Sequence, residues 1–189
     1  MQIFLFFLVL LQCVLSVTIL IVGVVLAYFM INSKFMLNSP PVPTQGKVRQ
    51  GMVEDVARLL ARRKNQVVMD LGSGWGSLLL PLAKRFPEHH FIGIEYGFLP
   101  CFVSRLRARG LHNITFRREN FFKTDISQAN VIFMFLLKHI MVKITPKCQK
   151  ECKKGTLIYA NRFPMPDVKP EQEVSFGSKY LTYYVYKIS

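Results

Sequence analysis

Residues 67–80 read VVMDLGSGWGSLLL, an apolar run that ends in an aspartate and is followed by three glycines and a second apolar run. The first run is typical of a buried strand, and residues 76–86, which include the second run, are typical of a helix. The glycines at positions 72, 74 and 76 allow a tight turn and let a ligand approach the backbone closely. The stretch therefore predicts a strand, a ligand-binding loop and a helix in that order.

Strands and helices alternate on the C-terminal side of this unit, and an amphipathic helix over residues 48–63 precedes it. The apolar patterns predict further strands over residues 90–96, 113–120, 130–136 and 156–163, with helices over 100–109 and 138–150. Residues 171–189 read as two strands around a turn at Gly177-Ser178. This order predicts an α/β fold, a Rossmann-like seven-stranded, mostly parallel sheet with an antiparallel C-terminal hairpin.

The N-terminal part of the chain has a different composition. Residues 1–33 carry no charged side chain, and Gln12, Ser16 and Thr18 are the polar interruptions of residues 3–31. A helix of that length spans about 43 Å, more than the hydrocarbon core of about 30 Å. We therefore expect one transmembrane helix that contacts the lipid bilayer through residues 3–31. The domains expected are an anchor (1–33), a Pro-rich linker (34–46) and a folded domain (47–189).

Charge indicates the orientation and the partners. No Lys or Arg precedes the apolar stretch, whereas Lys34, Lys47 and Arg49 follow it, which predicts the N-terminus outside and the folded domain on the cytoplasmic side. The absence of an Arg-rich presequence favours a bacterial inner membrane over a mitochondrial one. The net charge of +14 suits nucleic acid or anionic lipid, and the apolar stretch makes lipid the simpler explanation. Cys148 and Cys152 lack a second ligand pair, so no metal is expected, and the oligomeric state stays open.

Two acidic residues narrow the ligand of the glycine loop. Asp70 ends the first strand, and Glu95 ends the second, 19 residues after Gly76, where a carboxylate can bind both hydroxyls of a ribose. An adenosine-containing ligand fits this arrangement. The dinucleotide pattern G-x-G-x-x-G fails because Ser77 occupies its third glycine position, and no Gly-Lys-Ser/Thr of a phosphate loop follows.

The pattern D-L-G-S-G-W-G resembles motif I of the Rossmann-like S-adenosylmethionine-dependent methyltransferases. That resemblance implies S-adenosyl-L-methionine as cofactor, with Asp70 near its amino-acid end and Glu95 on the ribose. It also implies that Asn120 and Phe121, after the third strand, contact the adenine. The expected cofactor-binding residues are Asp70, Gly72, Ser73, Gly74, Gly76, Glu95, Tyr96, Asn120 and Phe121.

Further segments occur in the order found in one family. The Pro-Val-Pro-Thr arm (41–44), D-L-G-S-G-x-G, G-I-E, R-R-E-N-F-F-K and N-R-F-P-M-P (161–166) resemble the small membrane-anchored protein-lysine methyltransferases. Mitochondrial members of that family modify the ATP synthase c-subunit and the adenine nucleotide translocase. The resemblance implies a lysine of a membrane protein as substrate. The residues expected at the substrate entrance are Pro41, Pro43, Thr44, Arg162, Phe163 and Pro164.

Some features depart from the family pattern. Trp75 stands where members often have aspartate, and F-M-F-L-L-K-H lacks the proline expected after the fourth strand. A methyltransferase of a membrane quinone or lipid, and a non-catalytic cofactor-binding module, therefore remain alternatives. A nucleic-acid enzyme is disfavoured because no Asp/Asn-Pro-Pro-aromatic motif follows the fourth strand. The sequence identifies no catalytic base, although His139 and Tyr96 are within reach in principle.

Overall fold

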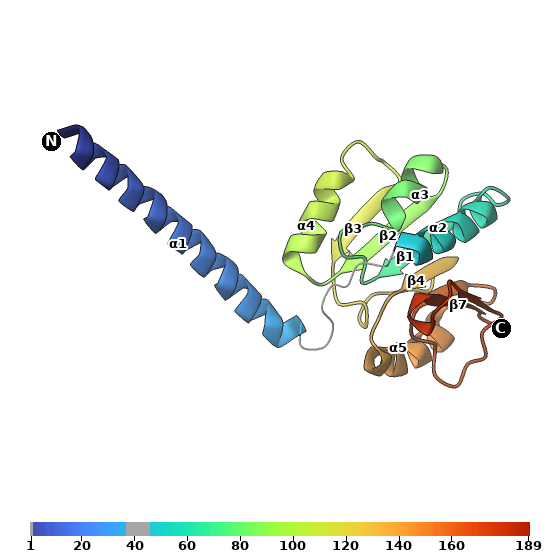
Figure 1. Ribbon diagram of the computed structural model, residues 1–189. Helices are drawn as coiled ribbons and strands as arrows, with labels where there is room; N and C mark the ends of the chain where they lie inside the picture. The colour runs from blue at the N-terminus through green and yellow to red at the C-terminus, as the bar shows by residue number, and fades with distance from the viewer. Residues whose placement is uncertain (1, 37–45) are drawn as a thin grey trace. The chain divides into compact units, whose positions relative to one another are not determined.

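The computed structural model describes residues 2–36 and 46–189, and the chain divides into two compact units, residues 1–40 and 41–189 (Figure 1). The first unit is a single helix, α1 (Gln2–Met36). Its stretch Phe6–Tyr28 has a mean hydropathy of 2.8 and is long and apolar enough to cross a membrane. The helix continues three residues past the predicted anchor, and residues 37–45 of the predicted linker lie outside the described part.

The second unit is a seven-stranded sheet with the strand order β3-β2-β1-β4-β5-β7-β6. Its first five strands are parallel, whereas β7 pairs antiparallel with both β5 and β6. The strands are β1 (Val67–Leu71), β2 (His90–Glu95), β3 (Ile114–Arg118), β4 (Val131–Met134), β5 (Leu157–Asn161), β6 (Gln172–Ser175) and β7 (Thr182–Lys187). The helices are α2 (Gly46–Leu60), α3 (Leu79–Arg85), α4 (Phe98–Arg107) and α5 (Lys138–Glu151). The predicted fold class is confirmed.

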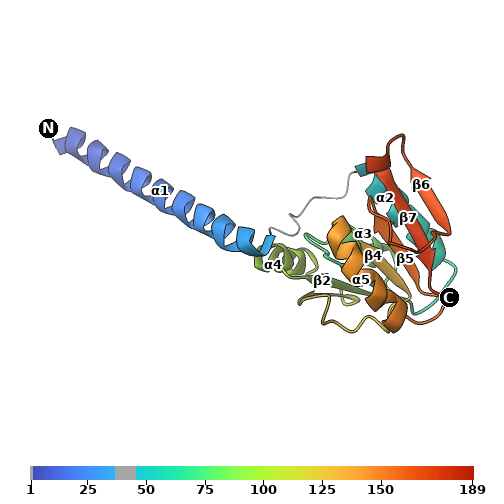
Figure 2. The same cartoon turned by 90° about the horizontal axis from the view of Figure 1, so that it is seen from below.

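Helices cover both faces of the sheet (Figure 2). Successive side chains of a strand point to opposite faces, so each face presents apolar side chains that helices can bury. Val68 of β1 belongs to one core, together with buried residues of α2, α3 and α4. Met69 belongs to the other core, which α5 covers. Each face of the sheet is thus sealed by apolar packing, and the ligand-binding edge is left to the loops.

Several element ends differ from the sequence-based predictions. Helix α3 begins at Leu79 and not at Gly76, because the glycine turn uses a positive φ of 75° at Gly76. Helix α4 begins at Phe98, two residues before the proline that was expected to start it. The C-terminal strands are joined by residues 176–181, which include the short helix η1 (Lys179–Leu181), so the connection is longer than a two-residue turn.

The order of the strands indicates which edge of the sheet binds a ligand. The chain passes from β1 to β2 and β3 on one side, then returns across β1 to β4 and β5 on the other. In open parallel sheets of this kind, ligands bind at the carboxyl ends of the strands where that reversal occurs. The loop after β1 lies at this switch point, and a Cβ at Gly72 would lie 3.4 Å from Leu136, which follows β4.

Candidate functional site

The loop after β1 is a backbone structure that glycine makes possible. Gly72, Gly74 and Gly76 have φ angles of 87°, 51° and 75°, in the left-handed region that other residues rarely adopt. The backbone N–H groups of Gly72 and Ser73 both donate to the carbonyl oxygen of Ile94, at 2.8 and 3.0 Å. The loop is therefore held against the end of β2, beside Glu95.

Glu95 links this loop to the next one. Its Oε2 accepts a hydrogen bond from the Gly74 N–H at 2.8 Å, and its Oε1 accepts one from the Gly97 N–H at 2.6 Å. The two bonds fix the orientation of the Glu95 side chain between the glycine loop and the residue before α4. The carboxylate is only half-buried, so it remains accessible to a ligand's hydroxyl groups.

Asp70 occupies a different environment at the end of β1. Its side chain is 4% exposed. Burial, and secondarily the charge of Glu95, raises the pKa of the Asp70 carboxyl from 3.8 to about 8. The carboxyl therefore holds its proton at neutral pH in the free protein, and a cationic group placed beside it would favour the ionised form.

Close packing beneath the loop leaves no room for added side-chain atoms. A Cβ at Gly93 of β2 would lie 2.3 Å from the ring of Phe116 and 2.8 Å from Ser73 Oγ. A Cβ at Gly76 would lie 2.6 Å from the same ring. Ser73 Oγ is buried and, among residues 2–36 and 46–189, has no hydrogen-bond partner. An orphaned hydroxyl in a glycine cradle is the pattern expected where a ligand supplies the partner.

Three further predicted cofactor residues lie at the ends of β2 and β3, which the bond from the Glu119 N–H to the Glu95 carbonyl (3.2 Å) holds together. Tyr96 is about half exposed directly after β2. Asn120 Oδ1 accepts from the Phe122 N–H at 3.0 Å, so in the free protein this side chain forms a turn. Phe121 packs partly against the core that α5 covers. All three are at the site edge, and their contacts to a cofactor stay predictions.

The predicted substrate entrance is described in part, because Pro41, Pro43 and Thr44 lie outside the described residues. Arg162, directly after β5, has a φ of 66°, which a residue with a side chain rarely adopts. Its guanidinium carbon lies 5.3 Å from the centroid of the Phe163 ring and 4.9 Å from that of Tyr180. Backbone strain of this kind gathers at functional sites, and the guanidinium next to it is within cation–π distance of two rings.

Sequence reasoning missed Tyr180, since it lies in the β6–β7 connection, 18 residues from Arg162. It also gave no role to the carbonyl of Trp75, which accepts a hydrogen bond from Arg107 Nη1 of α4 at 2.6 Å. Pro164 is exposed beside Phe163, and His139 is exposed in the first turn of α5. No sequence pattern signalled the contact of Arg162 with Tyr180 or that of Arg107 with Trp75, because each joins segments that are far apart in the chain.

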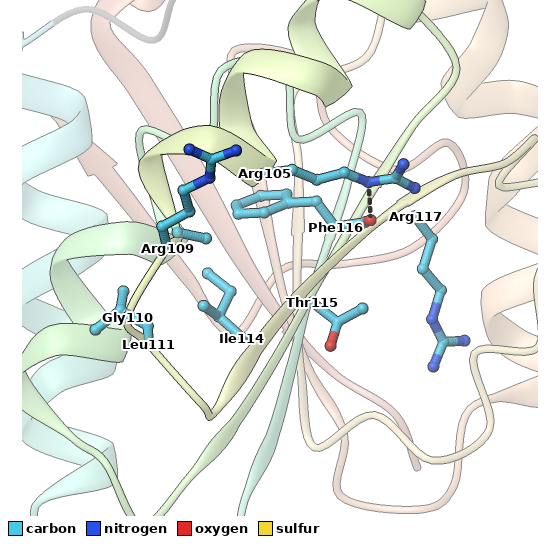
Figure 3. Close-up of a pocket in the computed structure, with 9 residues that line it drawn as sticks. Arg105, Arg109, Gly110, Leu111, Ile114, Thr115, Phe116 and Arg117 are labelled. Carbon is cyan, nitrogen blue, oxygen red and sulfur yellow. Dashed lines mark hydrogen bonds between the residues drawn. The ribbon is translucent and has the colours of Figure 1, made fainter.

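A hollow of about 480 Å³ lies elsewhere on the domain, between the C-terminal end of α4 and strand β3 (Figure 3). Arg105, Arg109 and Arg117 line it, and Arg105 Nε donates to the Phe116 carbonyl at 2.8 Å. None of the glycine-loop residues lines this hollow. It is therefore a shallow surface hollow apart from the cofactor site.

Taken together, the site offers what S-adenosylmethionine requires of a protein. The strand-end Asp70 can face the cofactor's ammonium group, and Glu95 can accept from ribose hydroxyls. Ser73 Oγ, which has no partner within the described part of the chain, can bond to a ligand. The residues present thus fit this group. The fold and site define a Rossmann-like methyltransferase.

Comparison with known proteins gives the family. The model of the ANTKMT methyltransferase domain matches residues 70–172. A protein-lysine N-methyltransferase of Saccharolobus islandicus is 32% identical over 79% of this chain and 93% of its own length. The chain belongs to the ANTKMT methyltransferase family and is an S-adenosylmethionine-dependent methyltransferase. The predicted resemblance, cofactor and enzyme class are confirmed.

Other relatives extend this result. The ATP synthase c-subunit lysine N-methyltransferase of Mus musculus is 30% identical over 73% of the chain, which spans only 54% of that relative. An RNA methyltransferase of Salinibacter ruber in complex with S-adenosyl-L-homocysteine superposes with a TM-score of 0.67 and 26% identity, covering 78% of this chain and 94% of that one. The chain thus spans about half the length of its mammalian relative but nearly all of these two microbial ones.

Proposed function

We propose that this methyltransferase is anchored in a membrane by α1 and methylates a lysine side chain of a membrane-associated protein. The observation that carries the proposal is the 32% identity to a protein-lysine N-methyltransferase over nearly that protein's whole length. Relatives named for lysines of the ATP synthase c-subunit and of the adenine nucleotide translocase add support, at 30% and 28% identity. Both named targets are membrane proteins, as an anchored enzyme would require.

S-adenosylmethionine supplies, when bound, an electrophilic methyl group on a positively charged sulfur. The role of this chain is to hold and align the reactants and to exclude water. Asp70 and Glu95 provide two carboxyl groups on neighbouring strands, and the glycine loop provides backbone groups between them. Uptake of the cofactor favours loss of the Asp70 proton, because the ionised form pairs with a cation.

A lysine amine must be neutral to act as a nucleophile, and a desolvated channel lowers its pKa. Arg162, between the rings of Phe163 and Tyr180, contributes a fixed positive charge beside the predicted entrance. Such a charge disfavours a second cation nearby and so favours the neutral amine. We assign Arg162 this role at the entrance, with the proton leaving to solvent.

The anchor also implies a side of the membrane. Lys34, Lys47 and Arg49 follow the apolar stretch closely, and no cation precedes it. This bias supports placement of the folded domain on the cytoplasmic side of the membrane that holds α1. The substrate lysine would then lie in a cytoplasmic loop or near the headgroups of the same membrane.

A second candidate is methylation of RNA. The net charge of +14 and the 26% identity to an RNA methyltransferase favour it. The two functions differ in where the methyl group is found. A third possibility, methylation of a membrane quinone or lipid, would place the methyl group in neither protein nor RNA.

Membranes containing the full chain, incubated with cofactor labelled in its methyl group, test the proposal. We expect label in small membrane proteins, recovered as methyl-lysine on amino-acid analysis. The label should be lost with Glu95→Ala and retained with Glu173→Ala, a matched change of an exposed residue on β6. Label recovered in RNA or in a lipid extract, without methyl-lysine, would refute the lysine proposal.

A further inference from the structure

The outward side of α4 is apolar, although within the described residues 46–189 it is exposed. Phe98 and Phe102 are 56% and 48% exposed, and Leu99 and Leu106 are exposed as well. Phe98, Phe102 and Leu106 recur every four residues, so they form one stripe along the helix. The two phenylalanine rings stack, with centroids 6.1 Å apart.

The side of α4 that the domain buries is a different one. Pro100, Cys101 and Ser104 are buried against the sheet, and Cys101 belongs to the core shared with α2 and α3. The exposed stripe is therefore not the core face of a loosely packed helix. It is a second apolar face, and contiguous apolar surface of this kind marks an interaction site.

Arginines flank the stripe on both sides. Arg105 of α4 and Arg109, which follows the C-terminal end of the helix, line the hollow against β3 together with Arg117 (Figure 3). Arg107 lies on the other side, and its guanidinium reaches the carbonyl of Trp75. The guanidinium of Arg118 lies 5.6 Å from the Phe98 ring centroid. Residues 97–118 contain these five arginines and no acidic residue.

We propose that this α4 face docks on the anionic headgroups of a lipid bilayer, with the rings of Phe98 and Phe102 at the acyl boundary. Aromatic and aliphatic side chains between arginines are the pattern of helices that lie in the membrane interface. Each arginine near an anionic surface strengthens binding about 5-fold. The chain also carries α1, a helix apolar enough to enter the same bilayer.

Docking at α4 would bear directly on the cofactor site. Gly97, the residue before α4, donates its N–H to Glu95 Oε1 at 2.6 Å, and Arg107 holds the glycine loop through Trp75. The helix starts at the carboxyl end of β2, where the site lies. A docked α4 therefore holds the site edge beside the headgroups. This inference is independent of which atom is methylated.

Fluorescence quenching on the full chain tests the docking. Trp75 is the only tryptophan, so Phe102→Trp adds one indole on the stripe, and Val142→Trp adds one at an exposed position on α5 as a control. Each chain is reconstituted into phosphatidylcholine bilayers with or without phosphatidylglycerol, using lipids brominated on their acyl chains. After subtraction of the Trp75 signal, we expect several-fold quenching for Phe102→Trp with phosphatidylglycerol, and little for Val142→Trp.

Charge reversal provides a second test of the docking. Arg105→Glu with Arg109→Glu, in the Phe102→Trp chain, should shift the ratio of docked to undocked domain about 25-fold or more and remove the quenching. Lys143→Glu with Lys150→Glu on α5 changes the net charge equally and should leave the quenching in place. Equal quenching at positions 102 and 142, or equal effects of the two reversals, would overturn the proposal. So would a Phe102→Trp signal that responds to added RNA but not to brominated lipid.

Discussion

Replacing Asp70 by asparagine should stabilise the free protein while weakening its hold on the cofactor. Asparagine has a similar shape but no charge to bury. The folded Asp70 carboxyl has its pKa raised from 3.8 to about 8, mainly by burial. Because the pKa of this carboxyl is higher in the folded than in the unfolded protein, the free energy of unfolding falls as pH rises. The loss of stability is absent below pH 3.8 and complete above about pH 8.

The magnitude follows from these two pKa values. At pH 7 the unfolded carboxyl is about 3 pH units above its ordinary pKa, whereas the folded carboxyl still holds its proton. At ~1.36 kcal/mol per unit, this difference lowers the free energy of unfolding by about 4 kcal/mol. At pH 5 the same reasoning gives about 2 kcal/mol. Asp70→Asn should therefore raise the melting temperature by about 10 °C at pH 7, and by less at pH 5.

Binding should change in the opposite direction, because a neutral amide cannot pair with the cofactor's ammonium group. Loss of a hydrogen bond to a charged group weakens affinity by about 10- to 100-fold. Trp75, the single tryptophan of the chain, reports unfolding of the domain without interference from α1. Urea titrations of the full chain in detergent at several pH values give stability, and calorimetric titration with S-adenosylmethionine gives affinity.

Asp125→Asn is the matched control. Asp125 is exposed, and a hydrogen bond from the Ser127 backbone N–H lowers the pKa of its carboxyl. Its replacement should give no stabilisation that grows with pH. If Asp70→Asn destabilised the protein at pH 7, or stabilised it equally at pH 5 and pH 7, the burial argument for Asp70 would be wrong.

Three further changes probe the site and its support. Glu95→Gln keeps one acceptor for Gly74 or Gly97 and turns an N–H toward the other, so cofactor affinity should fall about 10- to 100-fold by calorimetry. Gly93→Ala forces a methyl group against Phe116 and should lower the free energy of unfolding by about 1–3 kcal/mol in urea. His89→Leu removes the buried ring that bonds the Gln66 N–H at 2.9 Å and the Leu60 carbonyl at 3.2 Å. It should cost about 1–3 kcal/mol for each group left unpaired, measured in the same titrations.

Each of these changes has a result that would contradict its reasoning. Unchanged cofactor affinity of Glu95→Gln would show that the two backbone bonds do not organise the site. A Gly93→Ala protein as stable as the parent would mean that Phe116 moves aside without loss. For His89→Leu, stability at or above that of the parent would show that apolar packing outweighs both hydrogen bonds.

Most of the fold followed from local patterns. The runs around Asp70 and Glu95 predicted β1 and β2, and their parallel pairing is observed from Val67 with His90 onward. Such runs are informative because a strand buried on both faces needs apolar residues throughout, whatever its neighbours. Element ends were less predictable. The start of α3 depends on the left-handed conformation of Gly76, which an apolar pattern does not record.

The site followed the same division. Spacing alone placed Asp70, the glycines and Glu95 at one edge, because parallel strands bring their carboxyl ends together. Spacing could not decide whether Asn120 contacts adenine or forms a turn, as it does with Phe122, and it did not predict that Arg162 lies beside two rings. These contacts depend on loops whose paths are set by the packed domain.

The sequence by itself determined the class of this protein, because the glycine loop, the strand-end carboxyl groups and the apolar N-terminal stretch are local features. Tertiary structure decided their chemistry. Asp70 keeps a proton at neutral pH only because strands from distant parts of the chain bury it. The stripe of Phe98 and Phe102 became a surface only when the opposite side of α4 packed on the sheet. The burial or exposure of a side chain depends on its contacts with residues that are remote in the sequence, so a local sequence pattern does not record it.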